Sequence, residues 1–209
     1  MTTLSEIKKH MLVAILRGAA PAVVLDIASA LSEGGIMCLE ITLNSPGALQ
    51  TIEYLSQQME GKILIGAGTV LSATAAEDAI SAGAKFIISP ITDEDTITRT
   101  KELGAVSIPG AFTPTEIYRA HSAGGDIIKV FPGTSGPGFI REILAPLPYI
   151  PLMPTGGINI ENIKEFKRAG AIAFGIGKSL VDTKKEINEE SLREITDNAK
   201  RFVHVVNFG

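Results

Sequence analysis

The sequence predicts an α/β fold of the (β/α)8 TIM-barrel class, in a single domain over residues 1–209 that opens with an N-terminal helix. Short apolar segments alternate along the chain with amphipathic stretches, and polar or glycine-rich turns join them. Eight such units fit into 209 residues, which is close to the smallest size of this barrel. A doubly wound open sheet with fewer strands is the alternative, and a wrong assignment of the short seventh strand would favour it.

Each expected strand is an apolar segment that precedes a helical stretch. The eight strands are Leu12–Leu16, Ile36–Leu43, Ile63–Ala67, Phe86–Ser89, Ala105–Ile108, Ile127–Phe131, Pro151–Met153 and Ala171–Ile176. A short helix precedes the first strand, and a long polar helix over 188–206 ends the chain. Thr113, Pro114 and Glu116 match a capping box with proline at the first helical position. The runs 92–95 and 159–162 are interpreted as further helix starts.

The second strand carries an internal check on the barrel, because its side chains alternate in character. One set is apolar and larger, and the other is smaller or polar. We expect the first set to face the helices and the second to face the barrel interior. The sets are Met37, Leu39, Ile41 and Leu43 on one side, and Cys38, Glu40 and Thr42 on the other.

Composition excludes several classes of function. The net charge is −4 with no basic cluster, and tryptophan is absent, so nothing indicates nucleic-acid binding. The single cysteine, Cys38, cannot form an intramolecular disulfide, and it is interpreted as inert core in a reducing, cytoplasmic protein. No signal peptide or membrane span is expected. His10, His121 and His204 are expected on helix surfaces without zinc-site spacing, so no metal is predicted.

Lys129 places a charged group inside the apolar segment 126–133. Burial of an ammonium group is costly, so such a lysine is usually paired or loses its proton. A neutral lysine amine is a nucleophile that can form a Schiff base with a ketone. The structural alternative is a lysine with a buried stem whose head reaches a carboxylate.

Three ionisable side chains are expected at the same end of the barrel. The C-terminal ends of the strands form the active site of this fold. They carry Arg17 after the first strand, Glu40 on the second and Lys129 on the sixth. These groups suit imine chemistry, because Glu40 can transfer protons while Arg17 clamps a carboxylate. A plain ion pair of Glu40 with Lys129 or Arg17 is the alternative.

Glycine-rich loops after the seventh and eighth strands predict a phosphate site. The run 155–159 leads into a helix, so its backbone N–H groups can cradle an anion, and the run 175–179 follows the neighbouring strand. Paired loops at these two strands form a frequent phosphate site of the fold. Tight turns without a ligand are the alternative.

These motifs, in this order, resemble those of the KDPG/KHG aldolases, which are class I enzymes that cleave 2-keto-3-deoxy-6-phosphogluconate. The resemblance runs nearly end to end, through 14–17, 39–43, 66–71, 88–90, 129–132 and 154–158. It implies that Lys129 forms the Schiff base and that Glu40 is the general acid/base. It also implies roles in substrate binding for the following residues: Arg17 and Thr69 with the pyruvate carboxylate, Thr155 in stereoselectivity, Pro90 and Phe131 in the substrate site, and Gly156, Gly157 and Gly177 with phosphate, to which we add Lys178.

The resemblance implies reversible cleavage to pyruvate and glyceraldehyde 3-phosphate, with 4-hydroxy-2-oxoglutarate as a further substrate. It also implies a cytoplasmic homotrimer of Entner–Doudoroff-type carbohydrate metabolism, with no metal or organic cofactor. Two rival functions stay open. A sugar-phosphate isomerase or epimerase would use Glu40 as base and Lys129 as an electrostatic clamp, and a non-catalytic barrel would only bind a phosphorylated metabolite.

Two departures from the resemblance concern substrate preference. Many members carry arginine where this chain has Asn44, and the runs 15–18 and 43–46 resemble the 2-keto-3-deoxy-6-phosphogalactonate aldolases instead. The run 154–157 resembles the gluconate branch, so the galactonate epimer is an alternative substrate. Lys178 stands where relatives usually carry serine, and it either pairs with phosphate or points to solvent.

Overall fold

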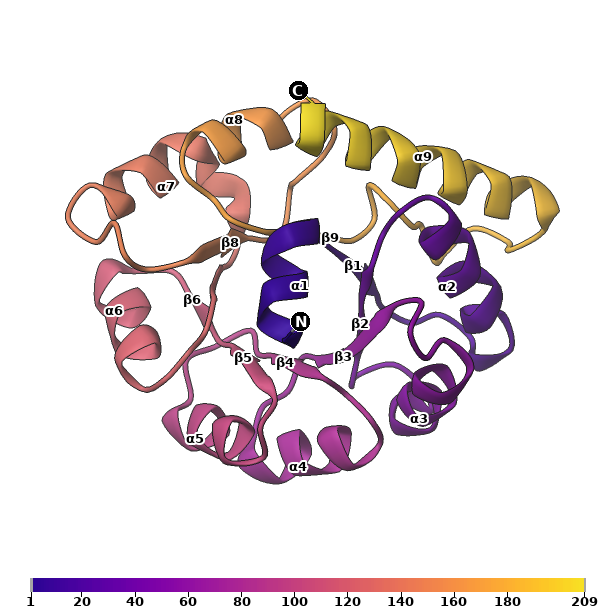
Figure 1. Cartoon of the computed structure of the whole chain (residues 1–209), viewed down its shortest axis with the longest axis horizontal. Coiled ribbons are helices and arrows are strands. Elements are labelled where there is room, and N and C mark those ends of the chain that lie inside the picture. The colour runs from indigo at the N-terminus through magenta and orange to yellow at the C-terminus, as the bar shows by residue number, and fades with distance from the viewer. Residues whose placement is uncertain (1, 209) are drawn as a thin grey trace.

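The computed structural model describes residues 2–208, in which a ring of helices surrounds a barrel of parallel strands (Figure 1). The strands are β1 Leu12–Leu16, β2 Cys38–Thr42, β3 Leu64–Gly68, β4 Phe86–Ile88, β5 Val106–Ile108, β6 Gly110–Ala111, β7 Ile128–Val130, β8 Leu152–Pro154 and β9 Phe174–Ile176. The helices are α1 Thr3–His10, η1 Pro21–Val23, α2 Val24–Glu33, α3 Ala48–Gln58, α4 Ala73–Ser81, α5 Glu94–Glu102, α6 Pro114–Ser122, η2 Gly133–Ser135, α7 Gly136–Leu144, α8 Ile163–Arg168 and α9 Glu189–Phe208.

The predicted TIM barrel is confirmed, and its fifth strand is divided at Pro109. One sheet has the order β5-β4-β3-β2-β1-β9, and the other has the order β6-β7-β8. β5 and β6 are the two parts of one barrel strand, because the proline between them has no N–H for the ladder. Pro109 O still accepts from Lys129 N at 2.9 Å, and Thr155 bridges Gly175 at the other seam. These contacts close the ring.

Several strands are shorter than the apolar segments that predict them. The second strand begins at Cys38, and the last begins at Phe174. The residues before them, such as Ile36 and Ala171, are buried without strand pairing. Their apolar character therefore reflects burial rather than a β conformation, and sequence pattern alone does not separate the two.

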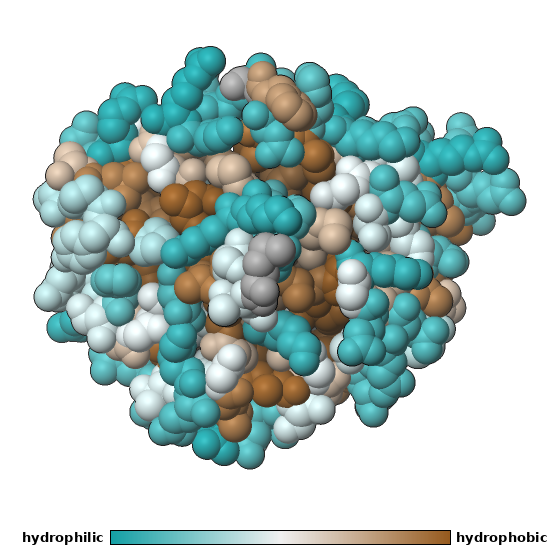
Figure 2. All heavy atoms as spheres, in the orientation of Figure 1, coloured by the Kyte–Doolittle hydropathy of each residue, from teal (hydrophilic) through white to brown (hydrophobic). Residues whose placement is uncertain are grey.

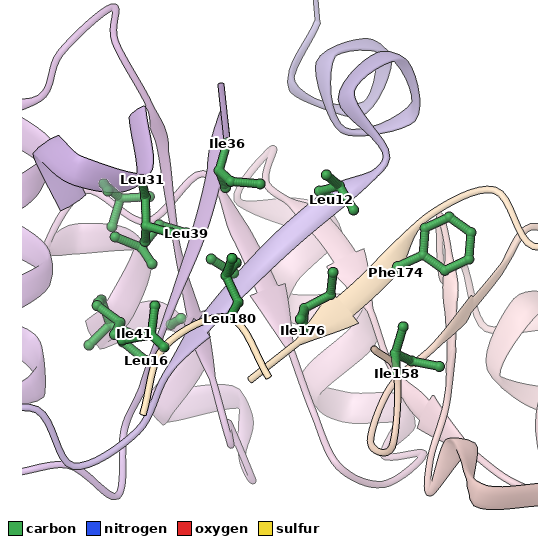
Figure 3. Packing of buried hydrophobic residues seen from close by; sticks show 14 of the residues in the cluster. Leu12, Leu16, Leu31, Ile36, Leu39, Ile41, Ile158, Phe174, Ile176 and Leu180 are labelled. Carbon is green, nitrogen blue, oxygen red and sulfur yellow. The ribbon is translucent and has the colours of Figure 1, made fainter. Parts of the chain in front are cut away.

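The alternation in β2 separates two layers of core, as the sequence predicts. Leu39 and Ile41 belong to the large cluster between the barrel and its helices, together with Leu16 and Leu31 (Figure 3). Cys38 belongs to the smaller cluster inside the barrel. Along β2 the interior side chains change from Cys38 to the buried polar residues Glu40 and Thr42 toward the C-terminal end of the strand.

Helix α1 covers the N-terminal end of the barrel (Figure 1). Its Ile7 is fully buried in the interior cluster, while hydrophilic side chains cover the outside of the helix (Figure 2). The candidate site therefore lies at the opposite end. None of the helices over residues 2–208 is long and apolar enough to cross a membrane.

The three predicted helix starts carry capping contacts, and one of them precedes its helix by a short turn. Thr113 and Glu116 form the predicted capping box of α6. Asp93 caps α5 by accepting from Thr96 N at 3.1 Å. Asn159 Oδ1 accepts from Asn162 N at 3.0 Å, and Asn162 Oδ1 accepts from Asn159 N at 2.9 Å, although residues 160–162 form a turn and α8 begins at Ile163.

Candidate active site

Lys129 lies at the centre of β7 with its side chain directed into the barrel end that holds the polar residues. Its Cα is in register with Gly110 of β6 and Met153 of β8. The residue is 4% exposed, and its Nζ lies 5.1 Å from the centroid of the Phe131 ring. The ring face favours a cation without supplying a hydrogen bond. Lys129 is therefore nearly buried, as the sequence predicts.

Glu40 is the second buried ionisable group of this region. It is 1% exposed, and neither carboxylate oxygen has a hydrogen-bond partner among the described residues. Burial raises the pKa of the Glu40 carboxyl above its usual range, while the charges of Lys129 and Arg17 oppose that effect. The simple alternative of a hydrogen-bonded ion pair between Glu40 and Lys129 is not present here. A buried carboxyl with a raised pKa is suited to proton transfer near neutral pH.

A pocket of about 920 Å³ opens at the C-terminal ends of β1, β8 and β9. Ile15, the register partner of Glu40, lines it, so the pocket reaches toward the buried pair. Glu40 and Lys129 lie deeper and do not line it. Seven residues expected to bind substrate or phosphate do line it: Arg17, Phe131, Thr155, Gly156, Gly157, Gly177 and Lys178.

The loop at Gly156 and Gly157 has the backbone of an anion cradle. Both residues have left-handed φ angles, +89° and +77°, which glycine adopts without strain. Asn162 Nδ2 donates to Gly157 O at 2.8 Å and fixes the loop. Because α8 has only six residues and starts at Ile163, the loop does not lead directly into a helix. The expected helix-end contribution to anion binding is therefore smaller than the sequence predicted.

Lys178 and Thr155 lie on opposite sides of the seam between β8 and β9. The Lys178 side chain is 80% exposed, and its Nζ lies 3.7 Å from Asp182 Oδ2. Thr155 is 4% exposed, and a methyl group at Gly175 would meet its Oγ1 at 2.3 Å. The absence of a side chain at Gly175 thus makes room for the Thr155 hydroxyl in the wall of the pocket.

Two expected site residues lie on the other side of the barrel mouth. Thr69 follows β3 and Pro90 follows β4, and neither lines the 920 Å³ pocket. Thr69 has a left-handed φ of 56°, which is strained for a β-branched residue. Such outliers gather at functional sites, which makes Thr69 a candidate on conformational grounds as well.

Sequence reasoning missed part of the pocket wall. Asp182, Thr183 and Lys184 line it from the loop between β9 and α9. Ser179, which belongs to the predicted run 175–179, also lines it, and its Oγ donates to Ile158 O at 2.6 Å. The loop lies beyond the glycine motif and has an ordinary polar composition, so its sequence carries no recognisable signal. Residues 2–208 contain no cluster of three His, Cys, Asp or Glu side chains that could hold a metal ion.

One family model matches most of the chain, and the similar sequences are aldolases of phosphorylated sugar acids. The family model described as "Aldolase: KDPG and KHG aldolase" matches residues 4–198. A probable 2-dehydro-3-deoxy-6-phosphogalactonate aldolase of Rhizobium meliloti is 37% identical over 171 residues, which are 81% of each chain. A 2-dehydro-3-deoxy-phosphogluconate aldolase of Treponema pallidum is 34% identical over 144 residues, which are 68% of each chain.

A solved structure is similar over almost the whole chain. It is the KDPG aldolase of Legionella pneumophila with pyruvate captured as a covalent carbinolamine intermediate. The TM-score is 0.81 at 27% sequence identity, and the match covers 98% of this chain and 96% of that chain.

Proposed function

Since the chain belongs to the KDPG and KHG aldolases, a family of class I lyases, we propose that it cleaves 2-keto-3-deoxy-6-phospho sugar acids to pyruvate and glyceraldehyde 3-phosphate. The observation that carries this proposal is the pair of Lys129 and Glu40. Both are at most 4% exposed, and the carboxylate accepts no hydrogen bond from residues 2–208. An unpaired buried carboxyl beside a buried amine is costly for a fold, and it is what imine chemistry requires.

The first half of the proposed reaction builds the imine. The unprotonated Lys129 amine attacks the C2 ketone carbon of the substrate and forms a carbinolamine. The Glu40 carboxyl, whose pKa is raised by burial, donates a proton to the leaving hydroxyl, and water departs. The product is a protonated imine between Lys129 Nζ and C2. The covalent carbinolamine captured in the Legionella relative supports the first of these steps.

The second half breaks the carbon–carbon bond. The Glu40 carboxylate accepts the C4 hydroxyl proton, the C3–C4 electron pair moves toward the iminium nitrogen, and glyceraldehyde 3-phosphate leaves. The enamine on Lys129 then takes a proton from Glu40 at C3. Addition of water to the resulting imine releases pyruvate and regenerates the amine. Glu40 thus both donates and accepts protons during the reaction, and no external oxidant or reductant is needed.

The two charged ends of the substrate are proposed to bind different residues around the barrel mouth. Arg17 and Thr69 hold the carboxylate, with Pro90 and Phe131 against the carbon chain. Gly156, Gly157, Gly177 and Lys178 hold the phosphate in the 920 Å³ pocket. A substrate without phosphate, such as 4-hydroxy-2-oxoglutarate, keeps the carboxylate contacts and loses the others. Its cleavage to pyruvate and glyoxylate is therefore expected to have a higher KM.

Both C4 epimers are candidates. Thr155 in the pocket wall and the run 154–157 favour 2-keto-3-deoxy-6-phosphogluconate. The Rhizobium relative, which matches more of the chain than the Treponema relative, favours the galactonate epimer, as do Asn44 and its neighbours. Steady-state kcat/KM for the two epimers, in wild type and Thr155→Val, decides between them. A preference carried by the Thr155 hydroxyl is expected to fall in the variant.

We also propose a homotrimer. Large apolar side chains are exposed in the loops after β3, β4 and β6, and Leu71, Ile91 and Phe112 are 56%, 51% and 38% exposed. Neighbouring strands bring these loops to one side of the barrel mouth, and a patch of this kind indicates a protein interface. Light scattering is expected to give about three times the 22.0 kDa of one chain. Ile91→Lys is expected to lower that mass, and a monomeric wild type would refute the proposal.

Borohydride reduction in the presence of pyruvate tests the central claim. Reduction of the imine is expected to fix pyruvate on Lys129, as located by peptide mass spectrometry, and Lys129→Met is expected to give no adduct. An isomerase that uses Lys129 only as a charge gives no adduct in wild type. A non-catalytic barrel gives no cleavage of either phosphorylated acid. An adduct on another lysine would also refute the proposed mechanism.

A further inference from the structure

The backbone at Arg17 is held by two hydrogen bonds from different parts of the chain. Thr183 Oγ1, in the loop between β9 and α9, donates to Arg17 O at 2.7 Å. The next residue, Gly18, donates its N–H to Ser45 Oγ at 2.8 Å. The oxygen and nitrogen of the same Arg17–Gly18 peptide unit are therefore both engaged by side-chain hydroxyls.

Ser45 is itself fixed to the barrel. Its N–H donates to Thr42 O at 2.9 Å and closes a four-residue turn after β2, in which Asn44 occupies the third position. Its Oγ lies 3.0 Å from Thr42 Oγ1, and Thr42 is fully buried. The connection thus extends from the barrel interior through Ser45 to the peptide of Arg17.

A fixed backbone matters for Arg17 because its side chain is long and exposed. The side chain lines the pocket, and within residues 2–208 its guanidinium donates no hydrogen bond. A long side chain of this kind loses much conformational freedom when it binds a ligand. A fixed backbone limits where the guanidinium can reach and lowers that loss.

We propose that Ser45 and Thr183 are positioning residues that hold the Arg17–Gly18 peptide and so direct the guanidinium toward the substrate carboxylate. The role of the carboxylate rests on the function proposed above, whereas the ordering of Arg17 does not. The inference gives Ser45 a role in ordering Arg17, and it links the loop at Thr183, which also lines the pocket, to the residue proposed to bind the carboxylate.

The test uses variants that remove or keep each hydroxyl in the full-length protein. Ser45→Ala and Thr183→Val remove it, and Ser45→Thr and Thr183→Ser keep it. Loss of one such hydrogen bond is expected to raise the Kd for pyruvate and the KM for the phosphorylated acid about 5-fold, with kcat within about 2-fold. The hydroxyl-retaining variants are expected to return KM toward wild type.

Ser56→Ala is the matched control. Ser56 Oγ donates to Glu53 O at 2.9 Å and to Ala82 O at 3.3 Å, away from the pocket. Its loss is expected to lower the melting temperature without a change in KM. If Ser45→Ala only destabilised the fold, its melting temperature would fall and its KM would stay unchanged, as in the control.

A second measurement is independent of any substrate. The NMR signal of the Arg17 Nε–H group is assigned by its disappearance in Arg17→Lys. Relaxation measurements are expected to show that the order parameter of this group falls in Ser45→Ala and Thr183→Val. Unchanged Arg17 order in both variants overturns the inference, whether or not the protein cleaves anything. Reduced order with unchanged pyruvate affinity overturns the assigned direction of the guanidinium. Absence of cleavage in wild type contradicts the proposed function, and the NMR result then decides this inference by itself.

Discussion

The Glu40 carboxylate occupies the space that a side chain at residue 68 would fill. A Cβ placed on Gly68 would lie 1.7 Å from Glu40 Oε1 and 2.3 Å from its carboxyl carbon. The two residues come from neighbouring strands, since Thr42 of β2 is in register with Gly68 of β3. Gly68 is thus what allows an acidic side chain to lie inside the barrel end at that level.

Gly68→Ala is therefore expected to displace the carboxylate and lower kcat/KM for the phosphorylated acid by about 100-fold, the usual contribution of a general acid/base. Overpacking is expected to cost about 1–3 kcal/mol of unfolding free energy. Enzyme assays and urea denaturation measure the two effects. Gly138→Ala is the control, because a Cβ at Gly138 in α7 meets nothing within 4 Å. Wild-type activity in Gly68→Ala would contradict the placement of Glu40 as the acid/base.

The raised pKa of Glu40 predicts a particular dependence of stability on pH. Glu40 binds its proton more tightly in the folded state than in the unfolded chain, where the pKa of the carboxyl is 4.5. The contribution of Glu40 to stability is therefore present below pH 4.5 and is lost as the pH rises through the folded pKa, at up to about 1.4 kcal/mol per pH unit. Glu40→Gln removes this loss. Its melting temperature relative to wild type is expected to increase from pH 4.5 toward neutral pH.

Glu116 offers the opposite sign within the same protein. The N–H groups of Thr113 and Phe112 donate to its carboxylate and hold its pKa below the usual value. Its contribution is present above the unfolded pKa and is lost as the pH falls through the folded pKa. Glu116→Gln is therefore expected to lose most stability at neutral pH and less in acid. Parallel pH profiles for the two variants would refute the assignment of the buried carboxyl.

The ion pair of Lys178 and Asp182 predicts a pair of changes in phosphate affinity. Lys178→Ala is expected to raise KM for the phosphorylated acid about 3-fold, a small effect because the lysine is mostly exposed. Asp182→Asn frees the lysine for the ligand and is expected to lower that KM. KM for 4-hydroxy-2-oxoglutarate, which has no phosphate, is expected to stay unchanged in both. Equal shifts for the two substrates would show that Lys178 does not act on the phosphate.

Sequence patterns predicted the barrel because strand and helix periods repeat along the whole chain. They did not predict the break at Pro109, since strand pairing on both sides of a proline depends on its neighbours in three dimensions. Most of the expected site residues lie at strand ends, which the fold itself identifies. The sequence singles out Ser45 only as part of the run 43–46, and Thr183 not at all, because their hydrogen bonds to the Arg17–Gly18 peptide join distant parts of the chain and no local pattern of residues encodes them.

Cys38 gives a test of how closed the barrel interior is. The thiol is fully buried in the interior cluster that also contains Val13 and Phe86, and burial, with a smaller effect of Glu6, raises its pKa to about 12. With this pKa, only about one buried thiol in 10,000 is ionised at pH 8. Iodoacetamide is therefore expected to label the unfolded chain within minutes and the folded protein only through rare opening.

The labelling rate, followed by intact mass, should rise in urea in step with the loss of helical circular dichroism. Labelling of the folded protein in buffer at the rate of a free thiol would mean that the interior below Glu40 and Lys129 admits solvent. Those two groups would then not be held in the water-poor surroundings on which the raised pKa of Glu40 depends.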